Sequence, residues 1–104
     1  MSTYYDLCDN NNRIRFYMGK GPYAAALEEV LDDVPTSRDD FVAAYNEVVN
    51  RKKGHKEDVT VLARRLWDFC TNARWNVTMV NDACGGLPDN VRGWPEVGSR
   101  YGND

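Results

Sequence analysis

Six carboxylates within thirteen positions form the densest group of chemically capable side chains in this chain of 104 residues. Paired carboxylates could serve acid–base cleavage of a glycoside, but nothing in the pattern builds a cleft around them. An acidic surface that docks on a basic partner, such as a groove that normally holds nucleic acid, fits the pattern better. A solvated helical surface is the alternative, because charged helix faces are common. The six residues are Glu28, Glu29, Asp32, Asp33, Asp39 and Asp40.

The side chains that could bind phosphate lie elsewhere in the sequence. A basic cluster covers Arg51–Lys56, and residues 19–24 have the form GxGxxA between a predicted strand and a predicted helix. A dinucleotide-binding domain needs parallel strands and a longer chain, so that assignment is rejected. Backbone amides at the helix start could still hold a small anion. The alternative function is therefore binding of a phosphorylated small ligand or nucleic acid, through Lys20, Lys52, Lys53, Lys56 and Arg64.

Charge is distributed unevenly along the chain. Residues 1–50 carry nine acidic and four basic side chains, a net charge of −5, whereas residues 51–104 carry seven acidic and nine basic ones, a net charge of +2. The total is −3. Domains that bind nucleic acid are usually basic, so this balance favours docking on a protein.

The sequence gives little support for a metal site or for a catalytic nucleophile. Cys8, Cys70 and Cys84 form no CxxC pair, and the single histidine, His55, has no cysteine or serine nucleophile pattern near it. Widely spaced cysteines without an export signal predict reduced, buried thiols and a cytoplasmic location. No apolar run approaches the roughly 18 residues of a membrane span. We expect no catalysis, no cofactor, no metal and no membrane partner.

Two short strand-like runs begin the chain. Residues 3–8 and 13–18 flank the triplet Asn10–Asn12, which suits a tight turn, so a β-hairpin is predicted. Side chains in the second run alternate between apolar and polar, as in a half-buried strand. A lone hairpin is marginally stable in water, so we expect it to lie on helices.

Three helices are predicted after the hairpin. A proline in the first turn and apolar residues at offsets of 4, 7, 8 and 11 predict a helix over 22–34. A threonine or serine N-cap, an acidic first turn and a glycine after a basic last turn predict a second helix over 37–53. An apolar stripe from Val59 to Cys84 predicts a long third helix over 57–84.

The third predicted helix carries another candidate binding patch. In a helix, Trp75 and Met79 would lie one turn apart and opposite the apolar stripe. They could anchor a partner or a second copy of the chain, and so long a helix in a small domain favours a homo-oligomer. The tail could instead fold back and cover both side chains. A strand over 75–79 is the competing interpretation of the segment.

The sequence therefore predicts a single α+β domain over 1–104 that is mainly α. It comprises a hairpin over 1–19, a helical body over 22–84 and an irregular tail over 87–104. The predicted function is a non-enzymatic protein–protein interaction module, a small inhibitor or adaptor whose acidic helical face docks on a basic, nucleic-acid-binding partner. Phage-encoded inhibitors of host nucleic-acid machinery are one example of this class, which is an analogy between kinds of protein.

Overall fold

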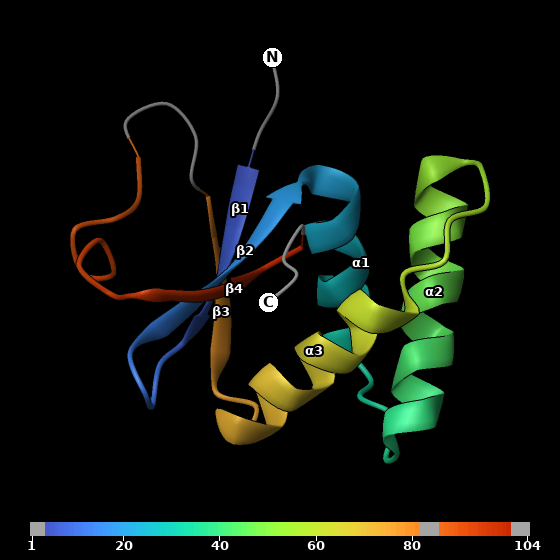
Figure 1. Ribbon diagram of the computed structural model, residues 1–104, viewed down its shortest axis with the longest axis horizontal. Helices are drawn as coiled ribbons and strands as arrows, with labels where there is room; N and C mark the ends of the chain where they lie inside the picture. Colours follow the sequence, from blue (N-terminus) through green and yellow to red (C-terminus); the bar gives the residue numbers. More distant parts are fainter. Residues whose placement is uncertain (1–3, 82–85, 101–104) are drawn as a thin grey trace.

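A computed structural model describes residues 4–81 and 86–100 of the chain. In this part of the chain, a four-stranded sheet carries three helices on one face, and the segment before the last strand lies on the other side (Figure 1). The elements in chain order are β1 (Tyr4–Asp9), β2 (Ile14–Lys20), α1 (Gly21–Leu31), α2 (Arg38–Lys53), α3 (Thr60–Asn72), β3 (Val77–Asn81) and β4 (Glu96–Ser99).

The sheet is mixed, with the strand order β3–β1–β2–β4. β1 pairs antiparallel with both β2 and β3, whereas β4 lies parallel to β2. The first two strands of the sequence are therefore the inner strands. Both outer strands, β3 and β4, follow the three helices in the sequence.

The predicted fold class is wrong. A mainly α fold, with one hairpin on three helices, does not describe a protein in which four strands make a complete layer. The largest error is the long helix predicted over 57–84, because α3 ends at Asn72 and a strand begins at Val77. Residues 82–84 of that predicted helix lie outside the described residues.

Backbone geometry after α3 prevents the helix from continuing. Arg74 and Trp75 have φ angles of 53° and 63°, in the left-handed region that a right-handed helix cannot pass through. The Trp75 N–H donates a hydrogen bond to the Cys70 carbonyl at 2.8 Å, which closes the turn. β3 then pairs along its whole length with β1. Pairing with a strand far away in the sequence thus overrides the local apolar stripe.

The turn between β1 and β2 is built around the buried carboxylate of Asp9. Its Oδ1 accepts hydrogen bonds from the backbone N–H groups of Asn11 and Asn12, each at 2.9 Å. Asn12 Nδ2 donates to Oδ2 of the same carboxylate at 2.7 Å, and Asn11 Nδ2 donates to the Ala73 carbonyl at 2.8 Å. The asparagines therefore shape the turn and also attach it to the end of α3.

The tail predicted to be irregular over 87–104 contains a strand. β4 pairs with β2, and Gly98 lies opposite Phe16. A Cβ on Gly98 would lie 2.8 Å from the Phe16 ring, so only glycine allows this approach. Residues 101–104 of the predicted tail lie outside the described residues.

The two residues that cap α2 are those that the sequence predicts. Ser37 is the N-cap residue, and its hydroxyl accepts a hydrogen bond from the Asp40 N–H at 3.1 Å. Gly54 ends the helix with a φ of 76°, the left-handed conformation of a glycine C-cap. Both predicted caps are confirmed. α1 ends at Leu31, earlier than the predicted residue 34.

Both cysteines in the described part of the chain, Cys8 and Cys70, are free thiols with no exposed surface. Burial and, to a smaller extent, the nearby Asp6 carboxylate raise the pKa of the Cys8 thiol to about 11. Burial also raises the pKa of the Cys70 thiol to about 12, with a smaller contribution from Asp9. Both groups stay protonated and inert as nucleophiles near neutral pH.

Slow alkylation of these two thiols is therefore expected. In a Cys84→Ser chain at pH 8, we expect iodoacetamide to label Cys8 and Cys70 roughly 100-fold more slowly in the folded protein than in urea. Mass spectrometry of the labelled peptides over time measures both rates. Equal rates in the folded and unfolded protein would contradict the buried positions of these residues.

Candidate functional site

Four exposed carboxylates gather at one end of the helical layer. α1 ends at Leu31 and α2 begins at Arg38, so two aspartates follow one helix and two lie in the first turn of the next. Among the described residues none of the four forms an ion pair. We call this group the acidic pole; it consists of Asp32, Asp33, Asp39 and Asp40.

The two helix ends keep these acids in place. Asp39 and Asp40 lie in the first turn of α2, where the helix dipole favours negative charge, and Arg51, Lys52 and Lys53 lie in its last turn. Since α2 has 16 residues, about 24 Å of helix separates its acidic end from its basic end. The acids are thus presented by rigid backbone rather than by a loose tail.

The remaining two of the six predicted acids, Glu28 and Glu29, are exposed on α1. Glu29 forms ion pairs with Arg51 and, at 3.4 Å, with Lys52. The hydrogen bond from the Arg51 guanidinium lowers the pKa of the Glu29 carboxyl. Glu29 therefore carries little unbalanced charge, and the six acids do not form one uniform surface.

Two of the five basic residues predicted to bind phosphate are paired with carboxylates in the described chain. Lys52 pairs with Glu29, and Lys53 pairs with Glu57 at 2.6 Å. Lys56 lines an open hollow together with Glu57 and Asp58, whose negative charges oppose phosphate binding. Two of the five lie elsewhere in the fold, Lys20 as the N-cap residue of α1 and Arg64 as an exposed residue of α3.

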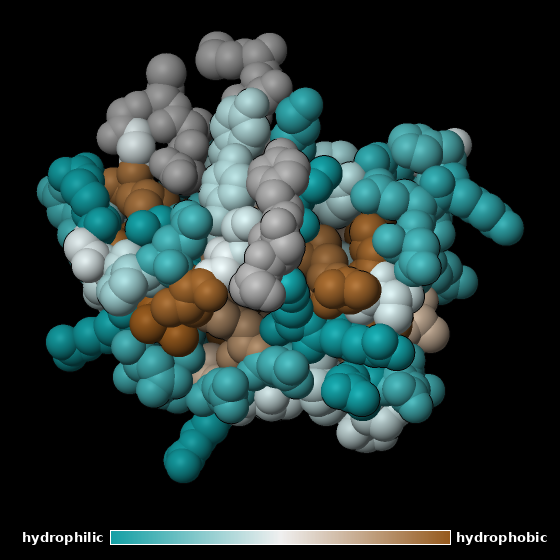
Figure 2. All heavy atoms as spheres, viewed as in Figure 1, coloured by the Kyte–Doolittle hydropathy of each residue, from teal (hydrophilic) through white to brown (hydrophobic). Residues whose placement is uncertain are grey.

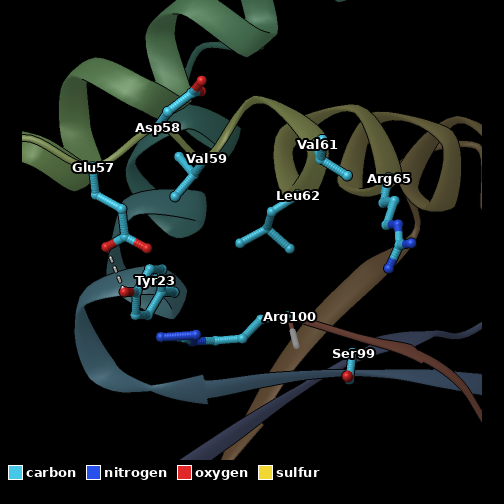
Figure 3. Close-up of a pocket in the computed structure, with 9 residues that line it drawn as sticks. All are labelled: Tyr23, Glu57, Asp58, Val59, Val61, Leu62, Arg65, Ser99 and Arg100. Carbon is cyan, nitrogen blue, oxygen red and sulfur yellow. Dashed lines mark hydrogen bonds between the residues drawn. The ribbon is translucent and has the colours of Figure 1, made fainter. Parts of the chain in front are cut away.

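A polar network that was not predicted from the sequence joins α1, α2 and the segment before α3 (Figure 3). The Tyr23 hydroxyl donates a hydrogen bond to Glu57 Oε1 at 2.7 Å. Lys53 Nζ donates to both of these oxygens, each at 2.6 Å. The Arg100 guanidinium lies over the Tyr23 ring, 3.7 Å from its centroid. Beside the network is a hollow of about 170 Å³.

The network is a poor candidate for acid–base catalysis. Hydrogen bonds from Lys53 and Tyr23 lower the pKa of the Glu57 carboxyl, and the hydrogen bond to Glu57 raises the pKa of the Lys53 amine. Both shifts move the groups away from neutral pH, where a general acid or base should titrate. The network instead holds the segment before α3 against α1 and α2. Its hydrogen bonds join residues up to 34 positions apart, so no local sequence pattern could have revealed it.

The predicted Trp75–Met79 patch depended on the long helix and does not have the predicted helical geometry. Trp75 lies in the turn after α3, half-buried, with its ring centroid 5.3 Å from that of Trp67 and 6.2 Å from that of Phe41. Met79 lies in β3 opposite Leu7 and packs against the core. The two residues are therefore not one turn apart on an exposed helix face.

No protein-family model, curated protein or solved structure matches this chain. Within residues 4–81 and 86–100, no group of three or more histidine, cysteine, aspartate or glutamate residues is arranged to hold a metal ion. In the same residues, no helix combines the length and apolar character needed to cross a membrane.

Proposed function

We propose that this protein is a non-enzymatic protein-interaction module that docks its acidic pole on a basic surface of a partner protein. The observation that carries the proposal is the grouping of Asp32, Asp33, Asp39 and Asp40, all exposed and without ion pairs in the described chain, at one end of the helical layer. A small inhibitor or adaptor that occupies a groove for nucleic acid would use such a surface.

Rigid presentation supports this use of the acidic pole. The four carboxylates lie at or next to helix ends, so little conformational entropy is lost when the pole meets a partner. Grouped like charges steer an oppositely charged partner toward the surface and raise the association rate. The alternative of phosphate binding is weaker because Lys52 and Lys53 are paired with carboxylates.

Neutralising part of the pole should remove partner binding. We expect Asp32→Asn/Asp33→Asn to weaken capture of basic partner proteins from a nuclease-treated lysate of the source organism by about tenfold at low salt. These two residues follow α1, so the change spares the first turn of α2. Quantitative mass spectrometry compares the captured proteins with those held by the unaltered chain.

A matched control separates the pole from net charge. Glu47→Gln/Asp89→Asn removes the same number of charges at exposed positions outside the pole, and it should leave capture unchanged. If all three chains hold the same basic proteins to the same extent, the acidic pole is not the docking surface.

A further inference from the structure

Buried polar groups lie on the face of the sheet that is turned away from the helices. Leu7 belongs to the hydrophobic core beneath the helices. Its neighbours Asp6 and Cys8 therefore point to the other face, because side chains alternate along a strand. Both are fully buried, and Arg15, which lies opposite Cys8 in β2, shares their face. A carboxylate, a thiol and a guanidinium are thus gathered on the side without helices.

A loop over residues 87–94, just before β4, lies on that side of the sheet (Figure 1). Val91 is its one buried residue, at 3% exposure, and it is outside the core beneath the helices. Most of the other residues are exposed, and the surface at the place of this loop is mostly hydrophilic (Figure 2). We call this segment the lid loop. A single buried side chain therefore supplies most of the apolar contact that holds it to the sheet.

The lid loop makes most of its polar contacts within itself. The Val91 N–H donates a hydrogen bond to the Pro88 carbonyl at 3.1 Å, and the Trp94 N–H donates to the Val91 carbonyl at 3.0 Å. Arg92 pairs with Asp89 at 2.8 Å. These contacts are kept when the loop moves away from the sheet, so the loop can move as one body.

Arg15 ties the lid loop to the sheet. Its Nε donates a hydrogen bond to the Trp94 carbonyl at 2.8 Å, at the end of the loop next to β4. Opening of the loop breaks this bond and exposes Val91, but it also brings water to the buried ion pair of Asp6 and Arg15. Because desolvation of such a pair costs free energy, its hydration offsets part of the lost contact. Opening of the loop should therefore cost less than unfolding of the domain.

We propose that the lid loop opens and closes over this face of the sheet while the helices and the strands stay folded. Asp6, Cys8 and Arg15 meet water only in the open state. The lid loop therefore controls access to the side of the sheet away from the helices. The acidic pole is carried by the α1–α2 connection, so this motion leaves it in place.

Alkylation by iodoacetamide in a Cys84→Ser chain tests the motion. Cys70 belongs to the core beneath the helices, whereas the equally buried Cys8 does not. Trypsin places the two thiols in peptides 1–13 and 66–74, so mass spectrometry measures both rates in one sample. Below the unfolding transition, the Cys8 rate should depend weakly on urea, because loop opening exposes little surface, and the Cys70 rate steeply. Equal urea dependences would show that only unfolding of the domain exposes Cys8, and would overturn the proposal.

Two matched variants of the same chain locate the motion. Val91→Ala removes the buried side chain of the lid loop and should speed labelling of Cys8 about tenfold. Val49→Ala truncates a fully buried side chain of α2, in the core that stays folded when the loop opens. It should speed labelling of Cys70 about tenfold and leave the Cys8 rate unchanged. The proposal is wrong if Val49→Ala speeds both thiols equally, or if Val91→Ala does not speed labelling of Cys8.

Discussion

Replacement of Phe41 by alanine is expected to lower the free energy of unfolding by about 3–5 kcal/mol. Phe41 has no exposed surface, and its ring contacts three other aromatic rings. The centroid distances are 6.5 Å to Tyr45, 5.5 Å to Trp67 and 6.2 Å to Trp75. Removal of the ring leaves a cavity at the point where α2, α3 and the turn before β3 meet.

Urea unfolding followed by tryptophan fluorescence measures this loss. Phe41→Leu is the control, because it keeps most of the buried volume and should cost about 1.5 kcal/mol or less. Trp67 and Trp75 contact Phe41, so the fluorescence of the folded alanine variant should change as well. A loss below about 1 kcal/mol for Phe41→Ala would mean that the aromatic cluster does not hold these elements together.

The aromatic cluster also explains why the end of α3 could not be predicted from local sequence. Val77 and Val80 continue the apolar stripe of the helix, although the chain turns at Arg74 and Trp75. Neither of these two residues is a glycine or asparagine, which usually indicate a left-handed backbone. Packing of Trp75 on α2 and pairing of β3 with β1 decide the conformation, and both involve residues distant in the sequence.

Elsewhere in the fold, the local sequence was sufficient to predict the structure. The caps of α2 depend on Ser37 and Gly54 alone, and both act as their residue types predict. The strand over 75–79 that competed with the long helix overlaps β3, which spans Val77–Asn81. β4 has only four residues, with Gly98 among them and a proline before it, so its sequence is typical of a loop.

The candidate site, too, could be predicted from the sequence only in part. The exposure of Asp39 and Asp40 follows from the helical spacing of the apolar residues of α2 that face the core, whereas Asp32 and Asp33 lie beyond the end of α1. The ion pairs of Glu29 with Arg51 and Lys52 depend on how α1 packs against α2, which the sequence does not specify. The same holds for the network around Tyr23, whose hydroxyl contacts residues of α2 and of the segment before α3.

The second large effect is expected at a buried ion pair between the two inner strands. Asp6 on β1 is fully buried, and its carboxylate pairs with the guanidinium of Arg15 on β2, whose side chain is 14% exposed. Arg15 Nε also donates a hydrogen bond to the Trp94 carbonyl at 2.8 Å, which attaches the segment before β4 to the sheet. This one side chain therefore links three parts of the chain.

Arg15→Met should lower the free energy of unfolding by about 3–5 kcal/mol, because it leaves the charge of Asp6 buried without its main partner. Asp6→Leu/Arg15→Met removes both charges, so the double variant should recover a large part of this loss. The unrecovered part reflects the lost hydrogen bond to Trp94. Urea unfolding of both chains measures the difference. A double variant less stable than Arg15→Met would indicate that the buried carboxylate of Asp6 is held by other partners and that the guanidinium is not what compensates its charge.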